Sequence, residues 1–180
     1  MKLDTITNKR KIENELNPND EFYTPSYAIK PLLKYLKKYK TIWCPFYTEE
    51  SLFVKMLKEQ GHKVINTHIF EGQDFFEYEP KEYDCIVSNP LYSLKTEVLE
   101  RLFELNKPFA MLLGVVGLFE SQKRFNMFKD NDFEIMYFNK RISYFRDYNE
   151  EKPMLNPPFS SVYITHSILP RQIIFEEVEK

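Results

Sequence analysis

Residues that could do chemistry come directly after an apolar run at positions 83–88, in the tetrapeptide Asn89-Pro90-Leu91-Tyr92. The Asn89 side chain offers an amide carbonyl, Pro90 offers a backbone carbonyl, and the ring of Tyr92 can stack on a flat partner. Two neighbouring carbonyls can accept the two N–H bonds of an amino group. Because ligands of an open parallel sheet lie beyond the carboxyl ends of its strands, this place is a candidate site. An ordinary Asn-Pro turn that ends a strand is the alternative.

The tetrapeptide resembles the Asn-Pro-Pro-Tyr/Phe motif of the gamma-type adenine-N6 DNA methyltransferases, in the form of a small phage-type member with a divergent cofactor loop. The resemblance implies that Asn89 and Pro90 accept the N–H bonds of the adenine amine, which favours a more tetrahedral nitrogen as the methyl group arrives. It also implies that Tyr92 stacks on the target base, swung out of the helix if it comes from duplex DNA. Leu91 replaces the second proline of the motif, which removes rigidity but no hydrogen-bonding group.

The resemblance further implies a cofactor, S-adenosylmethionine, and residues at its methionine end. Phe22-Tyr23-Thr24-Pro25 resembles the first cofactor motif of the family, in which an aromatic residue and a Thr-Pro turn flank the cofactor. Tyr23 and Thr24 are therefore cofactor-binding candidates. The alternative is an ordinary helix start with Thr24 as the N-cap and Pro25 as the first helical residue, and both interpretations can hold together.

At the adenine end of the cofactor, Gly72-Gln73-Asp74-Phe75-Phe76 resembles the loop in which an Asp binds the amino group of the cofactor and a Phe packs on its ring. Asp74 and Phe75 take these roles by resemblance. The alternative for Asp74 is a helix cap or a turn residue, and the two interpretations stay open.

The turn after the first predicted strand departs from the usual pattern. Most family members have a glycine-rich turn there, which lets the backbone approach the cofactor. Here the turn Trp43-Cys44-Pro45-Phe46-Tyr47 contains no glycine. Small phage-type relatives carry a similar Trp-x-Pro-Phe turn, which makes Pro45 a cofactor-binding candidate, and they commonly have an acidic residue where Tyr47 stands. Tyr47 would thus either line the pocket or block it.

A second tetrapeptide, Asn156-Pro157-Pro158-Phe159, matches the family motif letter for letter. It follows a polar loop and precedes an apolar run, so we expect a loop at the end of the sheet opposite to the site. In the same region, Lys140, Arg141 and Arg146 are interleaved with aromatic residues (Tyr144, Phe145 and Tyr148), which predicts a nucleic-acid surface. A packed aromatic loop with solvated charges is the alternative.

The elements that must position these residues alternate between strands and helices. Hydrophobic periodicity predicts helices at 26–40, 49–60, 94–105 and 121–130, and strands at 41–46, 63–69, 83–88, 109–116, 133–138 and 161–168. This alternation predicts an α/β, Rossmann-like sheet that is mostly parallel, with helices on both faces and an antiparallel hairpin from the last two strands. The resemblance names it the class I methyltransferase fold. We expect a flexible arm at 1–20 and one methyltransferase-like domain at 21–180.

The amino-acid composition limits which DNA, metal or membrane partners we expect. The net charge of −2 lacks the basic surplus of a dedicated duplex-binding protein, so any DNA contact must come from a local patch. The three histidines and two cysteines show no metal-ligand spacing, and no apolar run reaches the length of a membrane span, so we expect neither metal nor membrane. The predicted location is the cytoplasm, that of the host cell if the protein is phage-encoded.

Two functions remain open on the sequence. The first is an S-adenosylmethionine-dependent adenine-N6 methyltransferase that acts on DNA. The second is a catalytically inactive binding protein on the same fold, with a protein partner, such as a phage inhibitor of a host defence system. The retained Asn89, Tyr92 and Asp74 favour the first, and the turn without glycine together with Leu91 favours the second.

Overall fold

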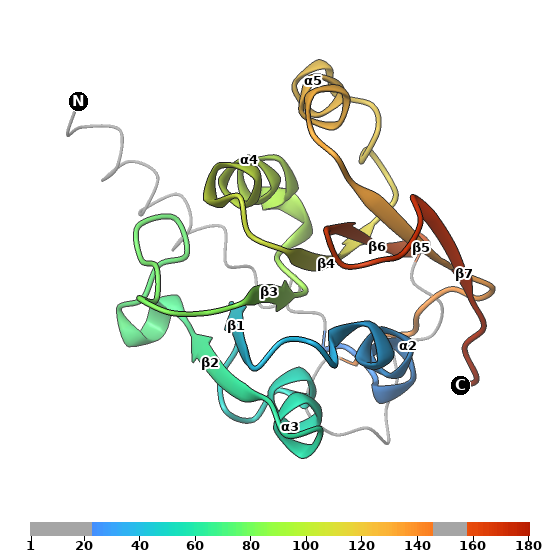
Figure 1. Cartoon of the computed structure of the whole chain (residues 1–180). Coiled ribbons are helices and arrows are strands. Elements are labelled where there is room, and N and C mark those ends of the chain that lie inside the picture. The colour runs from blue at the N-terminus through green and yellow to red at the C-terminus, as the bar shows by residue number, and fades with distance from the viewer. Residues whose placement is uncertain (1–22, 146–157) are drawn as a thin grey trace, which may run out of the picture.

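The computed structural model describes residues 23–145 and 158–180, which form a seven-stranded sheet with helices on both faces (Figure 1). The arm predicted at 1–20 lies outside the described residues. The helices are α2 (Ser26–Leu36), α3 (Leu52–Glu59), α4 (Lys95–Leu105) and α5 (Gln122–Asp130), with the short 3-10 helices η1 (Ile69–Glu71) and η2 (Tyr92–Leu94). The strands are β1 (Thr41–Pro45), β2 (Lys63–Thr67), β3 (Cys85–Ser88), β4 (Phe109–Gly114), β5 (Glu134–Phe138), β6 (Ser161–His166) and β7 (Ile173–Glu176).

The strands lie in the order β2-β1-β3-β4-β6-β5-β7. All neighbouring pairs are parallel except those of β6, which runs antiparallel between β4 and β5. The α/β class with a mostly parallel sheet is therefore confirmed, and so is the antiparallel pairing of the two predicted closing strands. The hairpin does not close the sheet, however, because β6 is inserted between β4 and β5, and β7, which the sequence did not predict, forms the edge.

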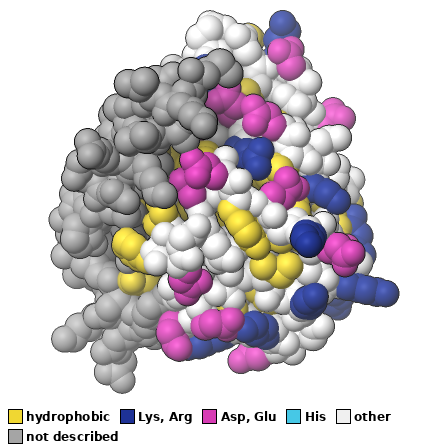
Figure 2. Space-filling model, turned by 90° about the vertical axis from the view of Figure 1, so that its left-hand side faces the viewer, with side chains coloured by type: hydrophobic (Ala, Val, Ile, Leu, Met, Phe, Trp, Pro, Cys, Tyr) yellow, Lys and Arg dark blue, Asp and Glu magenta, His cyan; other side chains and the backbone are white. Residues whose placement is uncertain are grey.

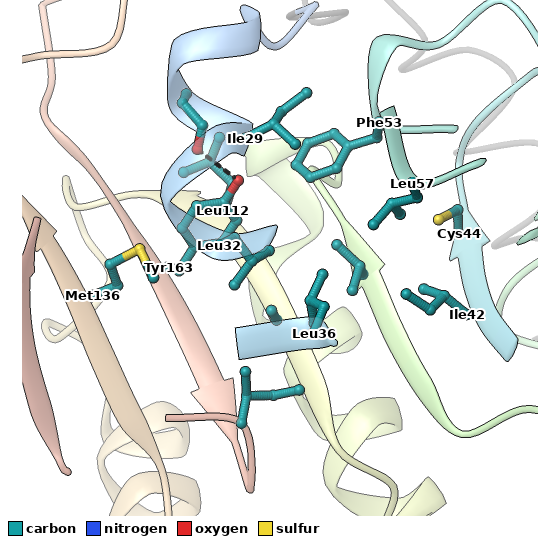
Figure 3. Packing of buried hydrophobic residues seen from close by; sticks show 14 of the residues in the cluster. Ile29, Leu32, Leu36, Ile42, Cys44, Phe53, Leu57, Leu112, Met136 and Tyr163 are labelled. Atoms are coloured by element: carbon teal, nitrogen blue, oxygen red, sulfur yellow. Dashed lines mark hydrogen bonds between the residues drawn. The ribbon is translucent and has the colours of Figure 1, made fainter. Parts of the chain in front are cut away.

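The central strands carry apolar side chains on both faces because helices cover both sides. Successive residues of β1 show this alternation: Ile42 and Cys44 pack toward α2 and α3, whereas Trp43 packs toward α4. Figure 3 shows the α2 side, where the hydroxyl of Tyr163 on β6 also donates a 3.0 Å hydrogen bond to the backbone carbonyl of Ala28 on α2. This core fixes the strand ends that carry the candidate site.

Helix α2 begins at Ser26, and its N-cap is Pro25, with no hydrogen bond from a capping side chain. The alternative in which Thr24 caps this helix is therefore wrong. The Thr24 hydroxyl instead accepts a 3.0 Å hydrogen bond from Nδ2 of Asn89. The physical reason is competition: the buried amide needs an acceptor, while the first backbone N–H groups of a helix can be solvated.

The turn from β6 to β7 is held by a single carboxylate. Glu134, the first residue of β5, accepts from the backbone N–H groups of Ser167, Ile168 and Leu169 and from the Thr165 hydroxyl, at 2.9, 3.3, 3.4 and 2.6 Å. Converging N–H groups form a natural anion site, and here the protein supplies its own anion. This arrangement fixes where β7 begins.

Candidate functional site

The candidate site lies at the topological switch point of the sheet. Strands β1 and β3 are neighbours, but the chain leaves β1 through α3 toward β2 on one side and leaves β3 through α4 toward β4 on the other. In open α/β sheets the crevice at the carboxyl ends of two such strands is the usual ligand position. Pro45 ends β1 and Asn89 directly follows β3, and the Ser88 hydroxyl donates to the Pro45 backbone carbonyl, which ties the two ends together.

The turn that leaves β1 has an unusual backbone. Phe46 adopts a φ of 68°, in the left-handed region that glycine normally fills. Such a conformation costs of order 1 kcal/mol in a non-glycine residue and persists only where the surroundings enforce it. Phe46 packs on Phe75 with 5.0 Å between the ring centroids, and Phe75 also packs on Trp43 at 5.4 Å. The backbone conformation typical of a glycine turn is thus present at this site without a glycine.

Asn89 is held in a fixed orientation. Its side chain is 9% exposed, and its Nδ2 donates to the Thr24 hydroxyl. That hydrogen bond fixes which edge of the amide is the donor and which is the acceptor. Pro90 is buried beside it. The structure therefore brings together three residues singled out by sequence, Thr24, Asn89 and Pro90, although the Asn89 Oδ1 is itself buried.

Tyr92 is directed into the protein. Its hydroxyl donates a 2.6 Å hydrogen bond to the Tyr144 hydroxyl, which donates a 2.7 Å bond to the Ser161 hydroxyl. Its ring packs edge-on against Phe159 at 5.2 Å. Burial raises the pKa of Tyr92, which keeps the phenol neutral. In this arrangement the partly buried ring that would stack on a base packs against the protein's own aromatic residues.

A glycine at the end of β4 makes this position of Tyr92 possible. A Cβ on Gly114 would lie 3.1 Å from Cδ2 of Tyr92 and 3.3 Å from Cδ2 of Phe159. These distances are tighter than ordinary contacts, so the two rings depend on the missing side chain. The sequence analysis did not single out Gly114, Tyr144 in this role, or Ser161. A glycine closing an otherwise apolar strand was the available signal for Gly114.

Tyr47 fills the space next to Asn89. Its ring stacks on Phe53 with 5.3 Å between centroids, and its hydroxyl is buried with no hydrogen bond of ordinary geometry among the described residues. Burial raises the pKa of this phenol well above its ordinary value, and the adjacent Thr24 side chain and Asn89 backbone offset only part of that rise. The phenol thus lies against the two residues that form the candidate site.

Asp74 lines a separate hollow beside the end of β2. Its Oδ1 accepts a 3.0 Å hydrogen bond from the backbone N–H of Phe76, which is the turn role anticipated as an alternative. The hollow has a volume of about 250 Å³ and is lined by Ile69, Gly72, Asp74, Glu77 and Tyr78. That volume lies below the roughly 300–1,000 Å³ of typical ligand pockets, so it suits one ring system rather than a whole nucleoside with its side chain.

The remaining cofactor candidates occupy different surroundings. Phe75 is 3% exposed and forms part of the core between Trp43 and Phe46. Tyr23 pairs with Phe145 through two backbone hydrogen bonds of 3.0 Å, an isolated antiparallel bridge that holds the chain before α2 against the segment after β5. Tyr23 therefore anchors the entrance to α2.

The described basic candidates lie at the same end of the sheet as Asn89, where the parallel strands finish. Lys140 and Arg141 are exposed and follow β5. Because β5 runs parallel to β4, the carboxyl ends of both strands lie at this end of the sheet. Arg146 and Tyr148 lie outside the described residues. Tyr144 and Phe145 are buried, so the described part of this loop matches the alternative of a packed aromatic segment with solvated charges.

The described part of the second tetrapeptide, Pro158 and Phe159, does not lie at the far end of the sheet, so that prediction is wrong. Because β6 is antiparallel, its first residue, Ser161, lies opposite Gly114, at the carboxyl end of β4. Phe159 accordingly contacts Tyr92. Asn156 and Pro157 lie outside the described residues.

The surface on the β2 side carries both signs of charge. Figure 2 shows acidic and basic side chains interspersed around a few apolar ones on this face. A mixed surface of this kind attracts a polyanion less than a single basic patch does.

Comparisons with known proteins give a structural likeness but no sequence relative. No family model matches the chain, and no curated protein matches it. Among solved structures, the chain is similar to a protein described as a modification subunit of a type I restriction enzyme from Vibrio vulnificus YJ016, with 12% identity and a TM-score of 0.48. The match covers 96% of this chain and 50% of that one, so this chain spans about half of its length. No helix among the described residues is long and apolar enough to cross a membrane.

Proposed function

We propose that this chain is an S-adenosylmethionine-dependent methyltransferase that acts on the exocyclic amine of adenine in DNA. The observation that carries the proposal is the position of Asn89 and Pro90 at the carboxyl end of β3, beside the end of β1, with the Asn89 amide oriented by Thr24. An oriented side-chain carbonyl followed by a proline carbonyl is suited to an amino group, which presents two N–H bonds.

The architecture agrees with this proposal. The fold expected from the family resemblance is a mostly parallel sheet with helices on both faces and an antiparallel terminal hairpin. The observed sheet is mostly parallel and pairs β5 with β6 in the antiparallel direction, although β7 and not this hairpin forms the edge. The strained turn at Phe46 lies where the resemblance puts the cofactor, and strained backbone is often found at functional sites.

The chain's own residues would perform the orienting steps. When bound, S-adenosylmethionine would supply an electrophilic methyl group and depart as the neutral thioether, and the methylated amine would lose one proton to water. Once a rearrangement beside Asn89 uncovers its buried Oδ1, this oxygen and the Pro90 carbonyl would accept the two N–H bonds, which raises the electron density on the nitrogen as the new N–C bond forms. Thr24 would keep the Asn89 amide in the orientation that makes this possible.

The residues fit the cofactor only after one side chain moves. The hollow beside Asp74 has room for a ring, whereas the space next to Asn89 and Thr24 holds the Tyr47 phenol. Among the described residues the buried hydroxyl of Tyr47 makes no hydrogen bond of ordinary geometry, so the closed arrangement carries a poorly satisfied polar group. A ligand with a polar group at this point, such as an amino acid moiety, would gain from the rearrangement.

Calorimetry and methyl transfer test the proposal together. The wild-type protein is titrated with S-adenosylmethionine and then assayed for methyl incorporation into adenine-containing DNA. Asn89→Ala should bind the cofactor and lose transfer, whereas Asn126→Ala, at an exposed asparagine on α5, should match the wild type. Transfer that survives Asn89→Ala would contradict the proposal.

A non-catalytic binding protein is the second candidate, and a specific observation favours it. Tyr47 fills the space beside Asn89, and the Tyr92 hydroxyl donates a hydrogen bond to the hydroxyl of the buried Tyr144. Such a protein could act on a protein partner, for instance as a phage inhibitor of a host defence system. The absence of cofactor binding at millimolar S-adenosylmethionine, in the wild type and in a Tyr47→Ala variant, would favour this candidate over the first.

A further inference from the structure

Strand β7 leaves one edge of the sheet open among the described residues. It pairs with β5 on one side and has no neighbour on the other. In Figure 1 it lies at the outer limit of the molecule. An open edge presents unpaired backbone N–H and C=O groups, and proteins usually block such an edge or use it for association.

The side chains of β7 divide sharply between the two faces of the sheet. Ile174 is 5% exposed and packs in the α2 core, whereas Ile173 and Phe175 are 50% and 77% exposed. Phe175 contacts Tyr137 of β5, itself 49% exposed, with 6.0 Å between ring centroids. Exposed apolar side chains that adjoin an open edge mark an interaction surface rather than a solvated one.

The pairing with β5 determines which backbone groups of β7 point outward. Ile135 donates to the Gln172 carbonyl and Asn139 donates to the Glu176 carbonyl, so the even-numbered residues face β5. In a parallel ladder the intervening residues direct their N–H and C=O groups to the other side. At Ile173 and Phe175, an additional strand along this edge would therefore meet both the exposed side chains and the outward-pointing backbone N–H and C=O groups.

The sequence around β7 is complementary to itself when read in the opposite direction. In Arg171-Gln172-Ile173-Ile174-Phe175-Glu176-Glu177, an antiparallel pairing centred on Ile174 puts Ile173 opposite Phe175 and Arg171 opposite Glu177. Arg171 and Glu177 are both exposed, and neither forms an ion pair within the described residues. The charges and the apolar residues thus match across one two-fold axis.

We infer that β7 is a homodimerisation edge, where a second copy of this chain adds its own β7 in the antiparallel direction. The outward N–H and C=O groups of Ile173 pair with those of Phe175 in the second copy, and the reverse pair follows from the symmetry. The exposed rings and Ile173 pack together on one face, and Arg171 meets Glu177 at each end. The edge spans only Ile173–Glu176, so the dimer is weak and depends on concentration.

The structure explains why this edge is rigid enough to pair. On the opposite face Glu176 accepts from Lys34 at 2.6 Å and from the Tyr35 hydroxyl at 2.7 Å, which fixes β7 to α2. These contacts involve the face of β7 that carries Ile174 and Glu176, and they do not involve Ile173 or Phe175. The inference does not depend on the proposed methyl transfer.

A charge exchange tests the inference directly. By sedimentation velocity at about 100 µM, in the range of weak interfaces, the wild type should show a monomer–dimer equilibrium. Arg171→Glu and Glu177→Arg should each raise the dissociation constant about tenfold, because each places like charges opposite one another. The double variant Arg171→Glu/Glu177→Arg should restore the wild-type value, since the pairs are re-formed with opposite polarity.

Two controls keep the outcome unambiguous. Lys63→Glu, on the β2 edge, and Glu59→Arg, at the end of α3, change the net charge equally at exposed positions and should leave the equilibrium unchanged. Phe175→Lys should abolish dimerisation while leaving the melting temperature of the monomer close to that of the wild type. A wild-type protein that is monomeric throughout, or a double variant no better than the single ones, overturns the inference.

Discussion

The side-chain amide of Asn89 donates a 3.0 Å hydrogen bond to the hydroxyl of Thr24, 65 residues earlier in the chain. This bond links the strand end that carries the candidate acceptor to the entrance of α2. Both groups are buried, at 9% and 5% exposure, so water cannot replace either partner. The orientation of Asn89 is therefore a property of the tertiary structure and not of its own turn.

Replacing Thr24 should release this orientation. Thr24→Val keeps the shape but removes the hydroxyl that accepts from Nδ2 of Asn89, and the loss of this buried hydrogen bond should cost about 1–2 kcal/mol. We expect a loss of roughly tenfold in kcat/KM for methyl transfer and a lower melting temperature, measured by radiolabel incorporation and calorimetry. Thr24→Ser restores the hydroxyl and should recover most of both. Equal losses in the two variants would mean that the methyl group of Thr24, not its hydroxyl, is what matters.

Tyr47 provides a prediction in which the effects on stability and on binding have opposite signs. Its buried hydroxyl has no hydrogen bond of ordinary geometry within the described part of the chain, so Tyr47→Phe should stabilise the fold by about 1 kcal/mol. Tyr47→Ala should open the space beside Asn89 and raise the affinity for S-adenosylmethionine about tenfold, at a stability cost of roughly 3 kcal/mol for the lost packing on Phe53. Calorimetry measures the affinity, and Tyr47→Phe, which keeps the bulk, is the matched control. If Tyr47→Ala gains no affinity, the phenol is not what closes the site.

Much of the sheet follows from local patterns. The runs in β1, β3 and β4 were predictable because strands buried on both faces are continuously apolar. Strand β7 was not, since its exposed Ile173 and Phe175 alternate with Ile174 and give a run too short to separate from a loop. The exposed positions of an edge strand carry no periodic signal for a buried face.

The candidate site likewise has one feature that the local sequence predicts and others that only the tertiary structure determines. The place of Asn89 after a strand is visible in the sequence, because a strand end is a local feature. The hydrogen bond from Tyr92 to Tyr144 spans 52 residues and depends on β6 entering the sheet in the reverse direction. Strand direction is fixed by tertiary pairing, which is why both the inward position of Tyr92 and the location of Phe159 escaped the sequence analysis.

Buried phenols should make the fold sensitive to alkali. Burial raises the pKa of Tyr39 from 10.0 to about 12, and burial shifts Tyr47, Tyr144 and Tyr163 in the same direction. The unfolded chain releases these protons near pH 10 while the folded chain retains them, so the stabilisation is complete below pH 10 and is lost as the pH rises toward 12. Tyrosinate absorbance should therefore rise together with the loss of circular dichroism. Tyr39→Phe should lessen the loss of stability between pH 10 and 12, and an unchanged loss would contradict the assignment.

Glu134 should contribute more to stability than its position near the surface suggests. Its carboxylate accepts from the backbone of Ser167, Ile168 and Leu169, and Ser167 has a φ of 56°, so the turn is both strained and held by this one group. Glu134→Gln replaces an acceptor oxygen with an NH₂ group that faces N–H donors, which should lower the free energy of unfolding by about 2 kcal/mol. Urea denaturation measures the change, with Glu104→Gln, at an exposed position on α4, as the control. Since the same turn sets the start of β7, Glu134→Gln should also weaken self-association, and a variant as stable as the control would show that the turn holds its shape without the carboxylate.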